Sequence, residues 1–312
     1  MSLEEELSAQ NFEKSSVLTI GVFDGVHLGH KELLNEVKRQ ARNLNCLSGV
    51  VTFRQHPDEL VHSGKILPHL TSLEERINRL KMEGIDRVVV LSFSRDMLEI
   101  EARDFVTLLW KYLKMKALVV GPDFALGKNR KGDAAFVREL GKEMDFTLTQ
   151  LPPKIIDGEI VSSTAIRKAL AVGDMDRVHA LAGQYFTFAG PVVTGFGRGK
   201  ELGFPTANLD VAPKQALPPD GVYATIAHIE DNVYHSLTSI GIRPTFGAGN
   251  RSIEVFILDY KGNLYGKNLK VEFIERLRPE KKFASAEELK KQIAEDINRG
   301  REILDGLSQG NS

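Results

Sequence analysis

The stretch G-V-F-D-G-V-H-L-G-H, Gly21 to His30, stands where an apolar run gives way to an amphipathic segment. Branched residues from Val17 to Phe23 predict a strand, and the pattern from His30 to Leu44 predicts a helix. A strand that turns through glycines into a helix is the unit of a parallel α/β sheet, where ligands bind outside the carboxyl ends of the strands. This stretch therefore predicts both the fold class of the N-terminal half and the place of its site.

The rest of the N-terminal half repeats this alternation of short apolar runs and amphipathic segments. A helix is predicted at Leu73–Met82, where Ser72, with Glu75 three residues later, gives a capping-box pattern. These segments predict a doubly wound, Rossmann-like sheet, then a short helical region from Ser163 to Ala182 that ends a first domain of residues 1–184. Further strands are predicted at residues 49–53, 87–93, 117–120 and 147–151.

From Tyr185 onward the pattern changes to strand-like runs separated by turn residues. The D-N pair at Asp231 and the K-G-N triplet at Lys261 suit hairpin connections. Residues 185–312 are therefore expected to form a second domain, a closed antiparallel β-barrel, whose final helix starts at Ser285 with Glu288 three residues later. Its strands are predicted at residues 186–194, 222–229, 233–240, 253–259 and 269–274.

The composition is that of an ordinary globular protein of two domains. The 312 residues are 42% hydrophobic and 27% charged, and the net charge of -1 gives no reason to expect an extended nucleic-acid surface. No apolar run approaches the roughly 20 residues of a membrane-spanning helix, and the acidic opening M-S-L-E-E-E-L is unlike a signal peptide. We expect a cytoplasmic protein without membrane or nucleic-acid partners, whose single Cys46 is a packed residue.

Two histidines stand at the predicted start of the first helix. His27 and His30 are three residues apart, and Gly29 between them keeps the backbone clear, so both imidazoles can face a phosphate at the helix N-terminus. The alternative is a pair of surface histidines in a turn. The glycines and the strand exit favour the phosphate site.

A second glycine-rich stretch, T-G-F-G-R-G-K-E-L-G-F-P-T-A-N, runs from Thr194 to Asn208. It fits neither common phosphate loop, because Lys200 stands where a dinucleotide fingerprint needs its third glycine and Glu201 where a P-loop needs a hydroxyl. Its glycines would still let the backbone approach phosphates closely. Thr206 and Asn208 offer two neutral oxygen ligands on one side of an extended segment, as suits Mg²⁺. The alternative is a flexible surface loop with incidental basic charge.

The strand R-S-I-E-V-F-I-L-D carries one carboxylate within an apolar run. A period of two places Glu254 on the same face as Phe256 and Leu258. A partly desolvated carboxylate there could accept a proton from a substrate hydroxyl. The alternative is an edge-strand glutamate turned to solvent.

These segments carry a family resemblance. H-x-G-H, with V-S-S-T-A-I-R at Val161–Arg167, resembles the nucleotidyltransferase superfamily, although S-S-T alone would be interpreted as a helix cap. T-F-R-Q-H-P at Thr52–Pro57 and V-G-P-D-F-A-L-G-K-N-R-K-G-D at Val120–Asp133 resemble the adenylyltransferase half of bacterial riboflavin kinase/FAD synthetase. That family's flavokinase barrel has a signature similar to G-x-G-R-G-x-x-L-G-F-P-T-A-N, and every specified position is present here. The resemblance spans roughly Val17 to Leu304.

The resemblance implies a bifunctional enzyme of FAD biosynthesis. The barrel would phosphorylate riboflavin to FMN with ATP and Mg²⁺, and the N-terminal domain would transfer AMP from a second ATP to FMN, releasing pyrophosphate. Histidines and a helix N-terminus would stabilise charge on the α-phosphate. The residues implied are Glu254, His27 and His30 for catalysis; Thr206 and Asn208 for the metal; His56, Asp123 and Arg243 for flavin; and, for ATP, Gly21, Phe23, Asp24, Gly29, Ser162, Ser163, Thr164, Arg167, Gly195, Gly197, Arg198, Gly199 and Lys200.

Departures from the family pattern bear on flavin binding. The family usually has proline where Gln55 stands, and often an arginine or threonine and then an aromatic where Ala125 and Leu126 stand. Loss of that aromatic could weaken stacking on an isoalloxazine ring. The alternatives are therefore a monofunctional riboflavin kinase with a degenerate or re-targeted N-terminal domain, and a flavin-binding sensor without catalysis.

Overall fold

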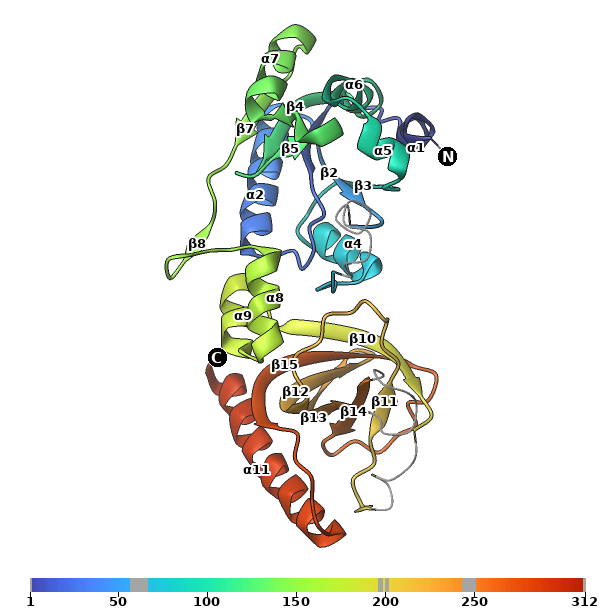
Figure 1. Cartoon of the computed structure of the whole chain (residues 1–312), viewed down its shortest axis with the longest axis vertical. Helices are drawn as coiled ribbons and strands as arrows, with labels where there is room; N and C mark the ends of the chain where they lie inside the picture. The colour runs from blue at the N-terminus through green and yellow to red at the C-terminus, as the bar shows by residue number, and fades with distance from the viewer. Residues whose placement is uncertain (1, 57–66, 196–198, 200–201, 243–250, 311–312) are drawn as a thin grey trace. The chain divides into compact units, whose positions relative to one another are not determined.

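Two compact units make up the chain, residues Met1–Ser163 and Thr164–Ser312. The computed structural model describes residues 2–56, 67–195, 199, 202–242 and 251–310 (Figure 1). The first unit holds a parallel sheet with helices, and the second holds an antiparallel barrel with helices. The predicted combination of an α/β half with a β half is confirmed.

The first unit is built on a five-stranded parallel sheet in the order β3-β2-β1-β4-β7. Successive side chains of a strand face opposite sides, so Val17 and Ala117 join one apolar core whereas Leu18 and Leu118 join the other. The strands are β1 (Ser16–Ile20), β2 (Leu47–Phe53), β3 (Arg87–Leu91), β4 (Met115–Val120) and β7 (Thr147–Gln150).

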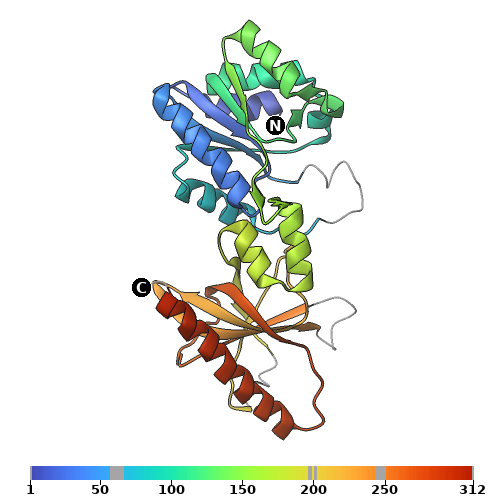
Figure 2. The ribbon, with the colours of Figure 1, turned by 90° about the vertical axis from the view of Figure 1, so that its left-hand side faces the viewer.

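Helices cover both faces of this sheet, and Figure 2 shows α2 lying lengthwise along it. One face packs against α2 (Leu28–Asn43) and α4 (Leu73–Met82). The other packs against α1 (Leu3–Gln10), α6 (Ala102–Leu113) and α7 (Ala134–Met144). Each leucine fully buried in these cores contributes roughly 1.5–3 kcal/mol. The predicted doubly wound sheet is confirmed.

Shorter elements complete the first unit. They are α5 (Arg95–Glu99), β5 (Ala125–Leu126) paired with β6 (Gly132–Asp133), the 3₁₀ turn η1 (Lys128–Arg130), and β8 (Ile155–Ile156) paired with β9 (Glu159–Ile160). The β8–β9 hairpin was not predicted, although its turn is Asp157-Gly158. Their φ angles of 51° and 79° are those that a tight hairpin turn requires.

The strand predicted to reach Phe23 is shorter than expected. It ends at Ile20, because Phe23 and Val26 adopt φ angles of 56° and 43° and turn the chain away from the sheet. The helix then begins at Leu28 with His27 as its N-cap. Ser72 caps α4 as predicted, since its hydroxyl accepts a hydrogen bond of 3.1 Å from the Glu75 N–H.

The second unit contains a closed antiparallel barrel in the order β10-β11-β14-β13-β12-β15, as predicted. Tyr223 and Phe273 are fully buried in it, with ring centroids 5.5 Å apart in an edge contact. β11 has three residues, too few for the alternation that predicted the other strands. The strands are β10 (Phe186–Val193), β11 (Ala207–Leu209), β12 (Gly221–Ile229), β13 (Asn232–Ile242), β14 (Arg251–Ile257) and β15 (Asn268–Pro279).

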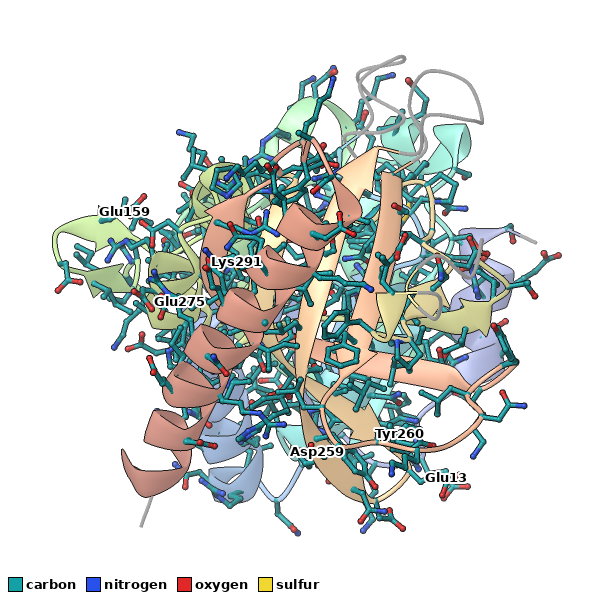
Figure 3. The ribbon with its side chains drawn as sticks, turned by 90° about the horizontal axis from the view of Figure 1, so that it is seen from below. Glu13, Glu159, Asp259, Tyr260, Glu275 and Lys291 are labelled. Carbon is teal, nitrogen blue, oxygen red and sulfur yellow. The ribbon has the colours of Figure 1, made fainter. Side chains whose placement is uncertain are left out.

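The final helix, α11 (Ala286–Gly310), crosses the outside of the barrel strands (Figure 3). Ser285 caps it as predicted, by accepting from the Glu288 N–H at 3.2 Å. Leu304 is buried against the barrel, and Arg278 donates from Nε and Nη2 to the carboxylate of Asp296, which is buried. A paired and hydrogen-bonded carboxylate of this kind fixes where the helix lies on the strands.

The boundary between the two compact units follows Ser163, whereas the sequence predicted a boundary after residue 184. The residues between these two boundaries form the helices α8 (Ser163–Val172) and α9 (Met175–Ala182). α9 packs on β10 and β15, and Gly173 between the helices lies against Arg276. The apolar face of α9 is therefore buried within the second unit.

Candidate active sites

The loop that follows β1 is strained. Phe23 and Val26 are non-glycine residues with left-handed φ angles, and for the β-branched Val26 this is a rare conformation. Both side chains are buried, and burial of this kind is what holds such strain in place. Strained loops of this type cluster at ligand sites, and this one leads directly into the two histidines.

The two predicted catalytic histidines lie in contact. His27 accepts a hydrogen bond of 3.3 Å at Nδ1 from the His30 N–H, and the two rings stack with centroids 3.6 Å apart. A Cβ on Gly29 would approach the His27 ring to 3.3 Å, so the glycine allows this packing. Because Nδ1 of His27 is an acceptor, the neutral imidazole carries its proton on Nε2, where it can be donated to a ligand.

His30 is held as a neutral imidazole. Its Nδ1 is buried and has no hydrogen-bond partner among the described residues, and its ring packs against Phe23 at 5.0 Å. Burial, followed by the charges of His27 and Arg76, lowers the pKa of His30 well below its ordinary value. At neutral pH His30 is therefore uncharged, beside the stacked ring of His27.

Asp24 and Gly21 lie in the same loop, but their described contacts are with the protein. The Asp24 carboxylate is 2% exposed and accepts hydrogen bonds of 3.0 Å from the N–H groups of Leu70 and Thr71. The Gly21 N–H donates to the carbonyl of Val51 at 3.0 Å. These contacts shape the loop, and the predicted contacts with ATP stay predictions.

The predicted nucleotide residues at the start of α8 are divided between the two units. Ser163, the last residue of the first unit, donates from its hydroxyl to the carbonyl oxygen of Asp24 at 2.8 Å. Ser162 precedes it, whereas Thr164 and Arg167 belong to the second unit. The structure thus brings Ser163 against the loop that carries the histidines.

The predicted flavin residues of the first unit lie outside the ends of the strands. His56 follows β2 and is partly exposed, and Asp123 follows β4 and is exposed. The carbonyl of Asp123 accepts from Arg130 Nη2 at 2.9 Å. Both positions are at the carboxyl edge of the sheet, where ligands bind in this fold class.

Leu126 and Gln55, two of the residues that depart from the family pattern, make contacts within the first unit. Leu126 is 9% exposed and belongs to the apolar core beneath α6. The side-chain oxygen of Gln55 accepts from the Phe93 N–H at 3.2 Å. Leu126 therefore packs inside the unit, so a ring in its place would have to enter the core in this arrangement.

The barrel brings three of its predicted site residues together. Asn208 on β11 pairs in register with Glu254 on β14, and the Thr206 hydroxyl donates to Oε2 of Glu254 at 3.2 Å. Because Thr206 donates its proton to the carboxylate, the lone pairs of its oxygen remain available to a cation. The arrangement offers two neutral oxygens beside one carboxylate, a donor set that suits Mg²⁺ held mainly by phosphates.

Two glycines of the signature approach these same side chains. A Cβ on Gly195 would lie 2.2 Å from Asn208 Nδ2, and a Cβ on Gly199 would lie 2.4 Å from the carbonyl oxygen of Phe204 and 3.2 Å from Thr206 Oγ1. The Phe204 N–H donates to the Gly199 carbonyl at 2.7 Å. The glycines therefore let the loop backbone pack directly on Thr206 and Asn208.

Glu254 lies on a half-buried face of β14. It shares that face with Phe256, opposite the buried Ile253, Val255 and Ile257, and Phe204 packs edge-on against Phe256 at 5.7 Å. The predicted face included Leu258, but the strand ends at Ile257. β14 is paired on both sides, with β11 and β13, so the alternative of an edge-strand glutamate is excluded.

Four of the predicted site residues lie outside the described residues. These are Gly197, Arg198, Lys200 and Arg243. Their predicted roles, three toward ATP and one toward flavin, stay predictions.

A residue that the sequence interpretation missed is Arg76 on α4. It is 4% exposed, and its charge contributes to the lowered pKa of His30. A signal was present in the sequence, because Arg76 stands three residues after Leu73 and four before Leu80, on the face of the helix that is buried.

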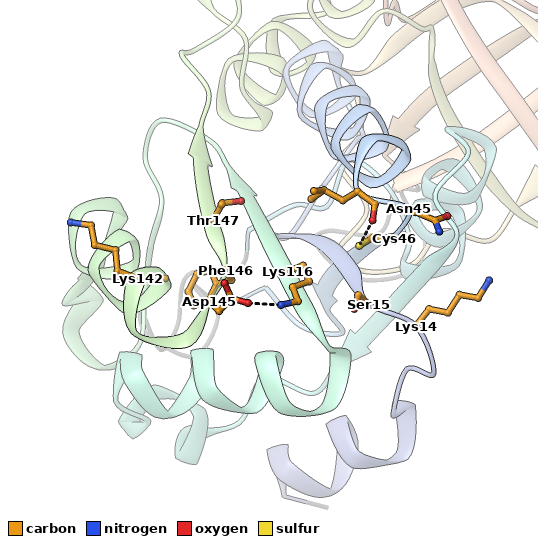
Figure 4. Close-up of a pocket in the computed structure, with 11 residues that line it drawn as sticks. Lys14, Ser15, Asn45, Cys46, Lys116, Lys142, Asp145, Phe146 and Thr147 are labelled. Atoms are coloured by element: carbon orange, nitrogen blue, oxygen red, sulfur yellow. Dashed lines mark hydrogen bonds and ion pairs between the residues drawn. The ribbon is translucent and has the colours of Figure 1, made fainter.

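A cavity of about 710 Å³ lies at the opposite, amino edge of the sheet (Figure 4). Lys116 at the start of β4 pairs there with Asp145 at 2.6 Å, and Cys46 and Thr147 also line it. The helices α2 and α7 end at this edge, so cations here complement their C-terminal carbonyls. The cavity is therefore separate from the histidine site at the carboxyl edge.

Metal and membrane features are few in the described part of the chain. It contains no group of three or more histidine, cysteine, aspartate or glutamate side chains that could hold a metal ion. It likewise contains no helix with the length and apolar character needed to cross a membrane.

Comparisons with known proteins agree with this division into two sites. The family model for FAD synthetase matches residues 9–165, and the family model for riboflavin kinase matches residues 182–304. Neither match covers residues 166–181, which hold most of α8 and all of α9 except its last residue.

Relatives of similar length match nearly the whole chain. A bifunctional riboflavin kinase/FMN adenylyltransferase from Escherichia coli is 37% identical over 299 residues, which are 95% of each chain. The protein of the same description from Bacillus subtilis is 34% identical over 293 residues, 91% of each chain. A crystal structure described as a macrolide-efflux protein from Streptococcus pneumoniae has a TM-score of 0.87 at 30% identity, covering 95% of this chain and 96% of that one. By its two matched family models and these full-length relatives, the chain belongs to the family of bifunctional riboflavin kinase/FMN adenylyltransferases.

Proposed function

We propose that this chain phosphorylates riboflavin to FMN in its barrel and then transfers AMP from ATP to FMN in its α/β unit, giving FAD and pyrophosphate. The observation that carries the proposal is the grouping of Thr206, Asn208 and Glu254 in the barrel, in a chain whose other unit presents His27 and His30. Family membership supports both activities in one chain.

In the kinase reaction, Glu254 accepts the proton of the ribityl 5′-hydroxyl as its oxygen attacks the γ-phosphate of ATP, and ADP leaves. Thr206 and Asn208 would hold Mg²⁺, which would supply positive charge to neutralise the phosphates. The backbone at Gly195 and Gly199 packs against these two side chains, which supports the proposal that the loop binds the phosphates. Phosphoryl transfer requires mainly this alignment and charge neutralisation.

In the adenylyl transfer, a phosphate oxygen of FMN attacks the α-phosphate of ATP and the bond to pyrophosphate breaks. His27 and His30, at the N-terminus of α2, donate N–H groups to the oxygens on which charge develops. No covalent nucleophile is required, because the reaction depends on positioning and electrostatic stabilisation. His56 and Asp123 contact the flavin phosphate and the nucleotide in this proposal.

We assign the adenylyl transfer to residues 1–184 and the kinase to residues 185–312. Mg²⁺ is the proposed ion because oxygen donors and phosphates favour it over softer metals. A cytoplasmic location is part of the proposal, because a chain with one cysteine does not depend on an oxidising compartment.

The purified chain should be incubated with ATP and Mg²⁺, with riboflavin in one tube and FMN in another, and the flavins separated by chromatography. FAD in both tubes is the expected result. If the riboflavin tube stops at FMN while the FMN tube is unchanged, the chain is a monofunctional kinase. If neither flavin changes, both assignments are wrong, and flavin binding without turnover would leave the sensor as the explanation.

A further inference from the structure

Arg76 joins the ends of two neighbouring parallel strands. Its Nη1 donates to the carbonyl oxygen of Val22 at 2.7 Å, and its Nη2 donates to the carbonyl oxygen of Phe53 at 2.8 Å. Val22 lies just beyond the end of β1, and Phe53 is the last residue of β2. A guanidinium carries its donors in a rigid plane, so the two carbonyls are held at a fixed spacing.

The position of Arg76 is costly unless these bonds are made. The residue is 4% exposed, and burial lowers its pKa although the charge of Asp24 acts in the opposite direction. A buried cation is tolerated where its donors meet acceptors, as Nη1 and Nη2 do here, whereas Nε is buried without a hydrogen-bond partner among the described residues. The carbonyl groups of Val22 and Phe53 therefore fix the position of the Arg76 guanidinium.

The residues that follow the two carbonyls are those predicted to face substrate. From Val22 the chain reaches His27 through the strained Phe23 and Val26, and from Phe53 it reaches His56. Strained residues persist only where the surrounding structure determines their conformation. A contact at Val22 therefore acts on the strained loop itself.

The segment that precedes α4 holds the same loop at a second point. The Asp24 carboxylate accepts from the N–H groups of Leu70 and Thr71 at 3.0 Å and from the Thr71 hydroxyl at 3.1 Å. Thr71 Oγ1 in turn accepts from the Gly25 N–H at 3.1 Å. Residues 70–76 are thus bonded to the loop on both sides of Phe23, which gives the loop a fixed frame.

We propose that Arg76 is a positioning residue for adenylyl transfer. Through the carbonyls of Val22 and Phe53 it holds the segments that carry His27 and His56 in the arrangement that the reaction requires. The inference rests on the proposed function of the first unit. Arg76 acts through these segments and touches no substrate, so its loss should reduce the rate of the bound complex rather than the binding of ATP or FMN.

The test compares Arg76→Met and Arg76→Lys in the full chain, with FMN, ATP and Mg²⁺. A displacement of about 1 Å can cost on the order of 10²-fold in rate, so kcat for FAD formation should fall about 100-fold in R76M, with both KM values within about threefold. R76K should recover about tenfold of that loss, because lysine keeps the charge but cannot hold two carbonyls in one plane. Riboflavin phosphorylation by the same chains should be unchanged.

Arg39→Met is the matched control, because Arg39 lies in the same unit, is 57% exposed at its side chain and pairs with Glu36 of its own helix α2. Its kcat for FAD formation should stay within about twofold of wild type, as expected for loss of a pair on one helix. Fluorescence of Trp110, the single tryptophan, reports whether the first unit is folded, since it lies on α6.

A folded R76M chain with wild-type kcat, or a change confined to KM, would overturn the proposal. If R76M is unfolded at the assay temperature, R76K decides: a lower kcat at unchanged KM supports the proposal, and wild-type kcat refutes it. A wild-type chain that forms no FAD refutes the proposed function itself, which is a different result from any produced by an Arg76 variant alone.

Discussion

The Thr206 hydroxyl donates a hydrogen bond of 3.2 Å to Oε2 of Glu254, next to the pairing of β11 with β14. This bond gives the two side chains different tasks. The carboxylate keeps its second oxygen for a substrate hydroxyl, whereas the threonine oxygen keeps its lone pairs for a cation. In the proposed kinase reaction, the proton acceptor Glu254 is thus a different group from Thr206 and Asn208, which are proposed to hold the metal ion.

Replacement of Glu254 by glutamine should stop riboflavin phosphorylation and leave the rest of the enzyme intact. The amide cannot accept the proton of the ribityl hydroxyl, and loss of a general base typically costs about 10²–10⁴-fold in kcat. Kinase turnover, riboflavin affinity and FMN adenylylation should be measured on one preparation, with Glu275→Gln, which removes a pair to Arg299 on α11, as the control. Kinase turnover within tenfold of wild type would exclude Glu254 as the base.

Replacement of Gly195 by alanine should also impair the kinase, but through geometry. The new Cβ would lie 2.2 Å from Asn208 Nδ2, so the loop or the Asn208 side chain must move. A displacement of about 1 Å suggests a loss on the order of 10²-fold. Gly306→Ala on α11 meets nothing within 4 Å and should leave kinase activity unchanged. Equal activity of the two variants would show that the loop does not bind phosphate at this point.

The fold could be predicted because its signals are local. Alternating apolar residues such as Val17 and Leu18 mark strands covered on both faces, and Ser72 and Ser285 mark helix starts by their own side chains. The end of β1 was misplaced because Phe23 and Val26 continue the apolar pattern while their φ angles turn the chain. A sequence pattern shows only which residues are hydrophobic. The strained φ angles after this strand persist because the side chains of Phe23 and Val26 are buried by the surrounding structure, which the pattern does not show.

The grouping of candidate site residues could be predicted where these residues lie close together in the sequence. The histidine pair and the signature ending at Asn208 are contiguous, so their spacing carries the geometry. The contacts of Arg76 were not predictable, because its acceptors, Val22 and Phe53, are brought to it by the fold from far along the chain. The buried contacts of Asp24 with Leu70 and Thr71 were missed for the same reason.

An aromatic residue at position 126 should weaken the protein without improving FMN binding. Leu126 is buried in the core of the first unit, so Leu126→Tyr forces a larger side chain into a packed space. Overpacking of this kind costs about 1–3 kcal/mol of stability. Urea unfolding followed by Trp110 fluorescence should show that loss, with the KM for FMN unchanged or higher. A lower KM for FMN in L126Y would mean that position 126 faces the flavin.

The stability of the first unit should fall with acid in a way that depends on His30. Burial lowers the pKa of His30 in the folded chain, so below about pH 6.5, the ordinary value for histidine, the unfolded chain binds a proton that the folded chain does not. Stability is therefore lost as the pH falls from about 6.5 toward the folded pKa, by up to roughly 1.4 kcal/mol per pH unit for one proton. Urea unfolding followed by Trp110 fluorescence between pH 5 and pH 8 should show a shallower slope for His30→Gln than for wild type. Parallel slopes would mean that His30 titrates alike in both states, and that the neutral imidazole in the site is not enforced by burial.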